Sequence, residues 1–373
     1  MLLADSSVSE RVRIVAGLVL GSVAVALVPI GWYFSHMLWI VAIALFFVGL
    51  VRTMGSEQWS GGPSPAPRRA RRRSLASLLP AAAALVIAGP AAAETHTRPL
   101  YDGAAQGSGH WRYERVSVDT DGRVAVYNTR EPRISVHLPD RARASGAAVV
   151  MLPGGGLRVL GMGRELQREV DAFVANGIAV IVLEYRTLQV DPDTLARPRQ
   201  PPPTGGAPIA FPRRAIRNGN ANPSPDDPAL NEVLRLATAD GQAALRLAHE
   251  KAAEWHLDPA RIGMIGTSAG GGVAFGALLS DGPPETKPDF VVSIFGPALQ
   301  DVAASADAPP LFLVTEADHG PVTDGLLALL SIWKGAGRRA ELHVYEVPNF
   351  SMTVDLWGAR LFEWMREQAI IPR

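Results

Sequence analysis

A serine stands at the centre of a glycine-rich pentapeptide, where its hydroxyl could act as a nucleophile. Residues 266–270 read Gly-Thr-Ser-Ala-Gly and fit the pattern G-x-S-x-G, with Ser268 in the middle. An apolar run precedes the pattern, and an amphipathic stretch, residues 269–279, follows it. A serine on such a tight strand-to-helix turn is held in a strained backbone conformation, and flanking glycines leave room for neighbouring chain. This context favours Ser268 as the nucleophile of an acyl-transfer site over the alternative, a plain glycine-rich turn.

A second glycine-rich loop precedes this motif in the chain. Gly154, Gly155 and Gly156 follow the apolar run at residues 147–152. Acyl transfer needs backbone N–H groups aimed at the oxyanion that develops on the substrate, and residues without side chains allow that approach. The candidate donors are the amides of Gly155, Gly156 or Leu157, together with that of Ala269. A phosphate-binding loop is the rival interpretation, but no Gly-Lys-Ser/Thr follows and no dinucleotide pattern is present.

Short apolar runs alternate with longer amphipathic stretches from Glu94 onward, as expected of strand–helix–strand units. Near-continuous apolar runs are typical of parallel strands that are buried on both faces. They predict such strands at residues 147–152, 178–185, 262–266, 290–295, 311–314 and 341–347. Two early antiparallel strands are expected at residues 124–127 and 134–138, and helices at residues 164–176, 233–255, 269–279, 324–335 and 359–370. The order predicts an α/β fold with a mostly parallel, doubly wound sheet and helices on both faces.

The sequence resembles the α/β-hydrolase superfamily, in its esterase/lipase group, and most closely the acetyl-xylan and feruloyl esterase-like proteins. The stretches that carry the resemblance are PGGGLRVL, FVANGIAVIVLEYR, AAEWHLDPARIGMIGTSAGG, PPLFLV and ELHVYE. Together they cover most of residues 120–370. The resemblance implies a serine esterase without cofactor or metal, acting on short acyl esters such as the acetyl groups of saccharides. It also implies Ser268 as nucleophile, an acid after the strand at 311–314 and a histidine after the strand at 341–347.

That histidine is missing. Where relatives carry Gly-Gly-His-Gly-Phe, the chain reads Pro-Asn-Phe-Ser-Met, so Phe350 occupies the position of the base and cannot accept a proton. In the loop after residues 311–314, Asp318 is the natural acid, and His319 follows it. His319 is the candidate base because, among the eight histidines, it alone is expected on a loop at the carboxyl edge of the sheet. Asp318, Glu316 or Asp355 could orient it.

Residues 191–228 interrupt the alternation of strands and helices. The segment contains ten prolines, with RPRQPPPTGGAP at its centre, and is predicted to lack regular structure. Loops this long inside a compact domain are usually lids, binding loops or disordered insertions. A flap over the active site and a passive loop are both compatible with the sequence.

The first 93 residues have the pattern of a membrane or secretory leader. Residues 14–34 and 37–51 are apolar and almost adjacent, which predicts a two-segment transmembrane hairpin within residues 1–53. Residues 54–93 contain a basic run, an apolar stretch and a small-residue end, as in a secretory signal. Alternatively, the natural start is Met54 and residues 1–53 are a misassigned extension. Both interpretations export residues 94–373 to the periplasm or beyond, tethered to the membrane if the leader is retained.

Charge and cysteine content exclude several classes of protein. Residues 1–93 contain 8 Arg against 3 acids, leaving 28 basic against 33 acidic residues in the rest of the chain, so no nucleic-acid surface is expected there. The chain has no cysteine and therefore no disulfide or thiolate metal site. Two hypotheses follow: an exported serine hydrolase of small-molecule or saccharide esters with an atypical triad, or a catalytically impaired pseudoenzyme that binds a ligand or partner in the same pocket.

Overall fold

The computed structural model describes residues 94–195, 215–348 and 350–373. The predictions for residues 1–53 and 54–93, and for the centre of the proline-rich segment, lie outside these ranges. Within the described ranges, no helix combines the length and the apolar composition that crossing a membrane requires.

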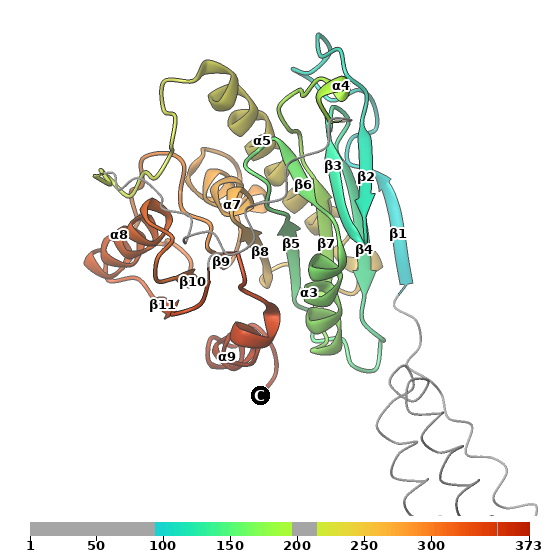
Figure 1. Cartoon of the computed structure of the whole chain (residues 1–373). Helices are drawn as coiled ribbons and strands as arrows, with labels where there is room; N and C mark the ends of the chain where they lie inside the picture. The colour runs from blue at the N-terminus through green and yellow to red at the C-terminus, as the bar shows by residue number, and fades with distance from the viewer. Residues whose placement is uncertain (1–93, 196–214, 349) are drawn as a thin grey trace, which may run out of the picture. The chain divides into compact units, whose positions relative to one another are not determined.

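An eight-stranded sheet forms the centre of the fold (Figure 1). Its strand order is β1-β4-β7-β5-β8-β9-β10-β11. The first two pairings are antiparallel, and every neighbouring pair from β7 to β11 is parallel. The strands are β1 (Glu94–Pro99), β4 (Arg133–Leu138), β5 (Ala148–Leu152), β7 (Ala179–Glu184), β8 (Ile262–Thr267), β9 (Val291–Ile294), β10 (Leu311–Glu316) and β11 (Ala340–Tyr345). The predicted mostly parallel α/β sheet is therefore confirmed.

The strand order places the two glycine motifs side by side. From β5 the chain runs to β7 on one side of it and later returns to β8 on the other side. The carboxyl ends of β5 and β8 are thus the topological switch point of the sheet, where α/β proteins bind their ligands. In the register of these strands, Leu152 lies opposite Gly266, so Gly154 and Ser268 leave the sheet at the same level.

Helices cover both faces of the sheet and explain why its central strands are apolar throughout. One face packs against α5 (Pro228–Glu250), α7 (Ala269–Leu279) and α8 (Pro321–Gly335), and the other against α3 (Arg164–Ala175) and α9 (Val354–Glu367). Figure 1 shows α3 and α5 on opposite sides of the sheet. All five residues of β5 are buried. The short α6 (Ala252–Trp255) follows α5, and a 3₁₀ turn, η2 (Pro284–Thr286), precedes β9.

A small antiparallel sheet lies beside the glycine-rich loop. It consists of β2 (Val116–Thr120), β3 (Arg123–Tyr127) and β6 (Val159–Gly161). The loop of residues 153–158 runs from β5 in the main sheet to β6 in this small sheet. Both ends of the loop are therefore fixed by strand pairing.

Two sequence-based expectations are wrong in detail. The helix after Ser268 is not amphipathic, because α7 lies between the sheet and α5 and is buried on most of its length. The segment 191–228 is not wholly irregular, because α4 (Pro192–Leu195) forms at its start. Proline is compatible with the first turn of a helix, where its missing N–H would have no partner.

The N-terminal cap of α5 provides a first testable prediction. The side chain of Asp227 accepts hydrogen bonds from the amides of Ala229 and Leu230, at 3.0 and 3.1 Å. Replacing Asp227 by Ala should lower the free energy of unfolding by about 1 kcal/mol, whereas Asp227→Asn should keep most of it. Urea unfolding of the three proteins measures the difference. Equal stability of the Ala variant and the wild type would show that the cap does not stabilise α5.

A buried carboxyl group on α3 should make stability depend on pH. Burial, with a smaller contribution from Glu165, raises the pKa of Glu169 from 4.5 to about 8. Between these two values the folded chain keeps a proton that the unfolded chain has released, so stability should fall as pH rises through this window. Glu169→Gln should therefore stabilise the protein at pH 8.5, by up to roughly 4–5 kcal/mol, and change little at pH 4.

Urea unfolding at the two pH values tests this prediction. The matched control is Glu165→Gln, one turn away on the same helix and much more exposed, which should leave most of the pH dependence in place. An unchanged pH slope in Glu169→Gln would contradict the assignment.

Candidate active site

Ser268 has the backbone strain expected of a nucleophile turn. It lies between the end of β8 and the start of α7 with φ 52° and ψ −123°. Such a conformation costs a non-glycine residue on the order of 1–3 kcal/mol, and it persists only where the surroundings impose it. Here the amide of Ser268 donates to the carbonyl of Ile294, and its own carbonyl accepts from the amide of Gly271, both at 2.9 Å. The half-buried side chain is thus held at the carboxyl edge of the sheet.

Packing explains both glycines of the pentapeptide. A Cβ atom on Gly266 would lie 2.3 Å from the carbonyl oxygen of Gly270, and a Cβ on Gly270 would lie 2.1 Å from the carbonyl oxygen of Leu152. Neither position can hold a side chain unless the backbone moves. The two glycines therefore allow the turn to form and bring it against the end of β5.

The glycine-rich loop lies against the nucleophile. A Cβ atom on Gly154 would come within 3.0 Å of the Ser268 Cβ atom. Gly155, Gly156 and Leu157 follow with φ values of 143°, 63° and 59°. The side chain of Leu157 is buried, and its carbonyl accepts from the amide of Leu188 at 2.7 Å, so the loop is anchored.

Three amides at this point are available to a ligand. Among the described residues, no backbone hydrogen bond begins at the N–H of Gly156, Leu157 or Ala269. Successive N–H groups in a turn of this kind form a concave donor site for an anion. Two of these predicted donors, Gly156 and Leu157, belong to the loop whose Gly154 lies against Ser268, and the third, Ala269, directly follows Ser268 in the chain.

The loop after β10 contains a buried acid–histidine pair. Glu316 is the last residue of β10, and both Glu316 and His319 are buried. The Nδ1 atom of His319 lies 2.5 Å from Oε2 of Glu316, although the angle departs from that of a hydrogen bond. Catalytic hydrogen bonds are often poorly aligned without substrate and tighten when it binds. The two buried side chains are therefore partners in space, as buried polar groups generally are.

The three acids considered for orienting the histidine occupy different environments. Asp318 is exposed at the surface. Asp355, at the start of α9, forms an ion pair with Arg168 of α3. Glu316 contacts the His319 ring from the end of β10. The sequence-based prediction ended this strand two residues earlier, which placed Glu316 in the loop as one of three alternatives.

Two aromatic rings hold the imidazole. The ring of Phe350 meets that of His319 edge-on with 5.0 Å between centroids, and Phe295 lies 5.6 Å away on a tilted plane. Phe350 is 56% exposed and has φ 62°, an unusual conformation for a bulky residue. Phe350, which stands where relatives carry the catalytic histidine, therefore packs against His319, the candidate base.

The loop after β9 contacts both Ser268 and His319. Phe295, which packs on His319, is the first residue after β9. A Cβ atom on the next residue, Gly296, would lie 2.6 Å from the carbonyl oxygen of Ser268. Since β9 lies between β8 and β10 in the sheet, Ser268 and His319 flank the same loop. Within the described part of the chain, no three His, Asp or Glu side chains are grouped to hold a metal ion.

Comparison with known proteins yields structural matches only. No protein-family model matches the sequence, and no curated protein matches it. A bifunctional acetyl ester–xyloside hydrolase from Caldicellulosiruptor lactoaceticus is 18% identical, with 74% of this chain and 97% of that chain covered and a TM-score of 0.47. A thermophilic esterase from Thermogutta terrifontis is 14% identical, with 68% and 94% covered and a TM-score of 0.46.

A third match is MGS-M1, an α/β hydrolase from a Medee basin deep-sea metagenome library. It is 15% identical, with 68% of this chain and 97% of that chain covered and a TM-score of 0.44. By their descriptions, the three proteins are a bifunctional hydrolase, an esterase and an α/β hydrolase. At such low identities, the function of this chain has to be inferred from the side chains around Ser268.

Proposed function

We propose that this protein is a carboxylic ester hydrolase with Ser268 as its nucleophile. The observation that carries the proposal is the strained backbone of Ser268 at the switch point of the sheet, in contact with a loop whose amides lack partners among the described residues. A plain glycine-rich turn would need neither the strain nor the adjacent donors. Backbone strain of this kind is typical of catalytic residues.

The geometry supports the usual two-step acyl transfer. The hydroxyl oxygen of Ser268 attacks the ester carbonyl carbon while a base takes its proton, and the carbonyl oxygen becomes an oxyanion. The amides of Ala269 and of Gly156 or Leu157 donate hydrogen bonds to that oxyanion. Collapse breaks the bond to the alcohol, which leaves with the proton from the base. Water then attacks the acyl-serine by the same route and releases the acid.

In this proposal, the base is His319, and Glu316 orients it. With Nδ1 facing Glu316, the other ring nitrogen, Nε2, is the one that exchanges protons with Ser268 and the leaving alcohol. The two rings of Phe295 and Phe350 restrict the imidazole, as an acid–base residue requires. The site thus keeps the chemistry of a serine–histidine–acid triad, with the histidine supplied by the loop after β10 instead of the loop after β11.

The substrate class and location are part of the proposal. Short acyl esters, including those of saccharides, are the substrates that the sequence resemblance favours. The signal-like pattern of residues 54–93 favours export of the domain, with a membrane tether if residues 1–53 are retained. No nucleic acid, cofactor or metal takes part.

A single substitution tests the proposal. The full chain should hydrolyse 4-nitrophenyl acetate, and Ser268→Ala should reduce the rate to the background of a buffer control, because no other group can form the acyl intermediate. The matched control is Ser280→Ala, which alters the cap at the other end of α7 and should retain full activity. Equal rates in the wild type and Ser268→Ala would refute the proposed nucleophile and would favour a binding role without turnover.

A further inference from the structure

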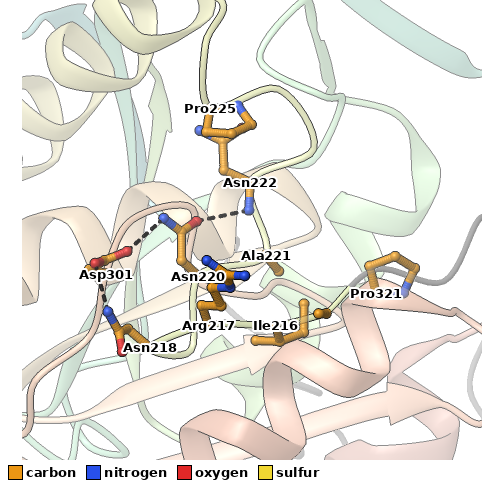
Figure 2. Close-up of a pocket in the computed structure, with 10 residues that line it drawn as sticks. Ile216, Arg217, Asn218, Asn220, Ala221, Asn222, Pro225, Asp301 and Pro321 are labelled. Atoms are coloured by element: carbon orange, nitrogen blue, oxygen red, sulfur yellow. Dashed lines mark hydrogen bonds between the residues drawn. The ribbon is translucent and has the colours of Figure 1, made fainter.

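A cavity lies where the end of the proline-rich insertion meets α8 (Figure 2). Its volume is about 340 Å³, and it is open to solvent. This volume lies near the lower end of the roughly 300–1,000 Å³ range that small-molecule sites occupy. Residues from three separate segments line the cavity. They include Ile216, Arg217, Asn218, Asn220, Asp301 and Pro321.

Chain connectivity places this cavity beside the proposed base. Pro321, on its rim, follows His319 by two residues, so their Cα atoms are at most about 7 Å apart. The opposite wall is tied to the loop after β9, since the amide of Ala221 donates to the carbonyl of Ala298 at 2.9 Å and that of Val302 to the carbonyl of Asn218 at 2.8 Å. The base of a serine esterase protonates the leaving alcohol. The rim of the cavity therefore adjoins the loop that carries the proposed base, the group that the leaving alcohol must approach.

Two amides fix an exposed carboxylate on the wall of the cavity. The side-chain amides of Asn218 and Asn220 donate to the two oxygens of Asp301, at 2.9 and 3.0 Å, and Figure 2 shows both side chains converging on it. These hydrogen bonds, that of Asn218 first, hold the pKa of Asp301 below its usual value. Asp301 is therefore ionised at neutral pH and can only accept hydrogen bonds, with lone pairs left on both oxygens.

A cation completes the set of polar groups. Arg217 lines the same cavity, is exposed, and forms no ion pair with another described residue. Its guanidinium offers up to five N–H donors. A ligand here thus meets a fixed acceptor and a strong donor close together, while Ile216 and Pro321 provide apolar surface beside them.

This combination discriminates between classes of ligand. A carboxylate or phosphate would be attracted by Arg217 and repelled by Asp301. An apolar alcohol would displace water from both charges and leave them unsatisfied. A hydroxyl group both donates and accepts, so neighbouring hydroxyls can serve Asp301 and Arg217 at once, while the C–H face of the ligand contacts the apolar residues.

We propose that this cavity binds the polyhydroxylated alcohol part of the ester, and that Arg217 and Asp301 determine this specificity. The inference rests on the proposed function, because it assigns the cavity to the leaving group of that reaction. The proposal also assigns a role to the end of the proline-rich insertion, because residues 215–222 form one wall of the substrate site.

Matched esters test this inference in the full chain. A monoacetylated methyl glucoside and cyclohexyl acetate release alcohols built on six-membered rings, with and without further hydroxyls. The wild type should prefer the glucoside ester over cyclohexyl acetate by roughly 10-fold or more in kcat/KM, the factor expected for hydrogen bonds to charged groups. Arg217→Gln and Asp301→Asn should each abolish most of this preference, by lowering kcat/KM for the glucoside ester. Arg373→Gln, at the exposed C-terminus, is the charge-matched control.

Two outcomes separate this inference from the proposed function. An unchanged preference in both variants, with Ser268-dependent hydrolysis intact, would overturn the cavity assignment alone. Without Ser268-dependent hydrolysis of any ester, the proposed function fails, and binding of methyl glucoside itself, followed by saturation-transfer NMR, becomes the test. Binding that Arg217→Gln weakens about 10-fold would then support the cavity as a polyol site. Absence of binding would overturn it.

Discussion

Replacing His319 by alanine should lower kcat for 4-nitrophenyl acetate by roughly 10⁴ to 10⁶-fold, because Ser268 would lose the base that takes its proton. The circular dichroism spectrum should show an intact fold. His110, an exposed histidine in the loop before β2, provides the matched control, and His110→Ala should keep the wild-type rate. Loss of activity in Ser268→Ala but not in His319→Ala would keep the enzyme and exclude this base.

Glu316 should act through His319 rather than on the substrate. Glu316→Gln keeps the size of the side chain but offers an amide to Nδ1, which favours the wrong tautomer and should lower kcat by up to about 10⁴-fold with little change in KM. Asp318→Asn should have a small effect, because that side chain is exposed. The reverse order of the two effects would assign the orienting role to Asp318.

The glycine-rich loop should be intolerant of a methyl group at one position and tolerant at the next. A Cβ on Gly155 would lie 1.8 Å from the carbonyl oxygen of Val159, so Gly155→Ala must displace the loop and its donors. Loss of an oxyanion donor lowers kcat by about 10² to 10³-fold, and Gly155→Ala should reach at least this range.

Gly156→Ala is the control for this prediction. A Cβ at Gly156 meets no atom within 4 Å, although φ is 63°, so the cost is conformational strain of about 1 kcal/mol without a clash. Its activity should fall much less than that of Gly155→Ala, when both are measured as kcat with 4-nitrophenyl acetate. Similar losses in the two variants would mean that the strained conformation alone, and not the packing of residue 155, maintains the donors.

The core of the fold could be predicted from sequence because its strands are buried on both faces. The apolar runs locate the strands β3, β4, β5 and β7 to β11 within two residues of their ends. β1, β2 and β6 were missed because they are short or contain polar residues at exposed positions. Helix α5 begins earlier than predicted because its first turn holds Pro228 behind the Asp227 cap, which apolar periodicity does not detect.

The candidate site could be predicted in part. The strained turn at Ser268 and the glycine loop beside it could be predicted, because each requires a residue type that the sequence shows directly. Glu316 was one of three acids that could orient His319, and the sequence could not single it out, because a three-residue spacing brings side chains together only if the turn after β10 has the right conformation. The cavity at Asp301 depends on contacts between residues about 80 positions apart, which no local pattern reveals.

The central claim is that Ser268 is a nucleophile activated by His319, and covalent labelling tests it most directly. The full chain is treated with a fluorophosphonate, which phosphonylates activated serines, and is then analysed by peptide mass spectrometry. The account predicts one phosphonyl group per chain, on the peptide that contains Ser268, and labelling at least 10³-fold slower in His319→Ala. No label on that peptide, or equal labelling rates in the wild type and His319→Ala, would contradict it.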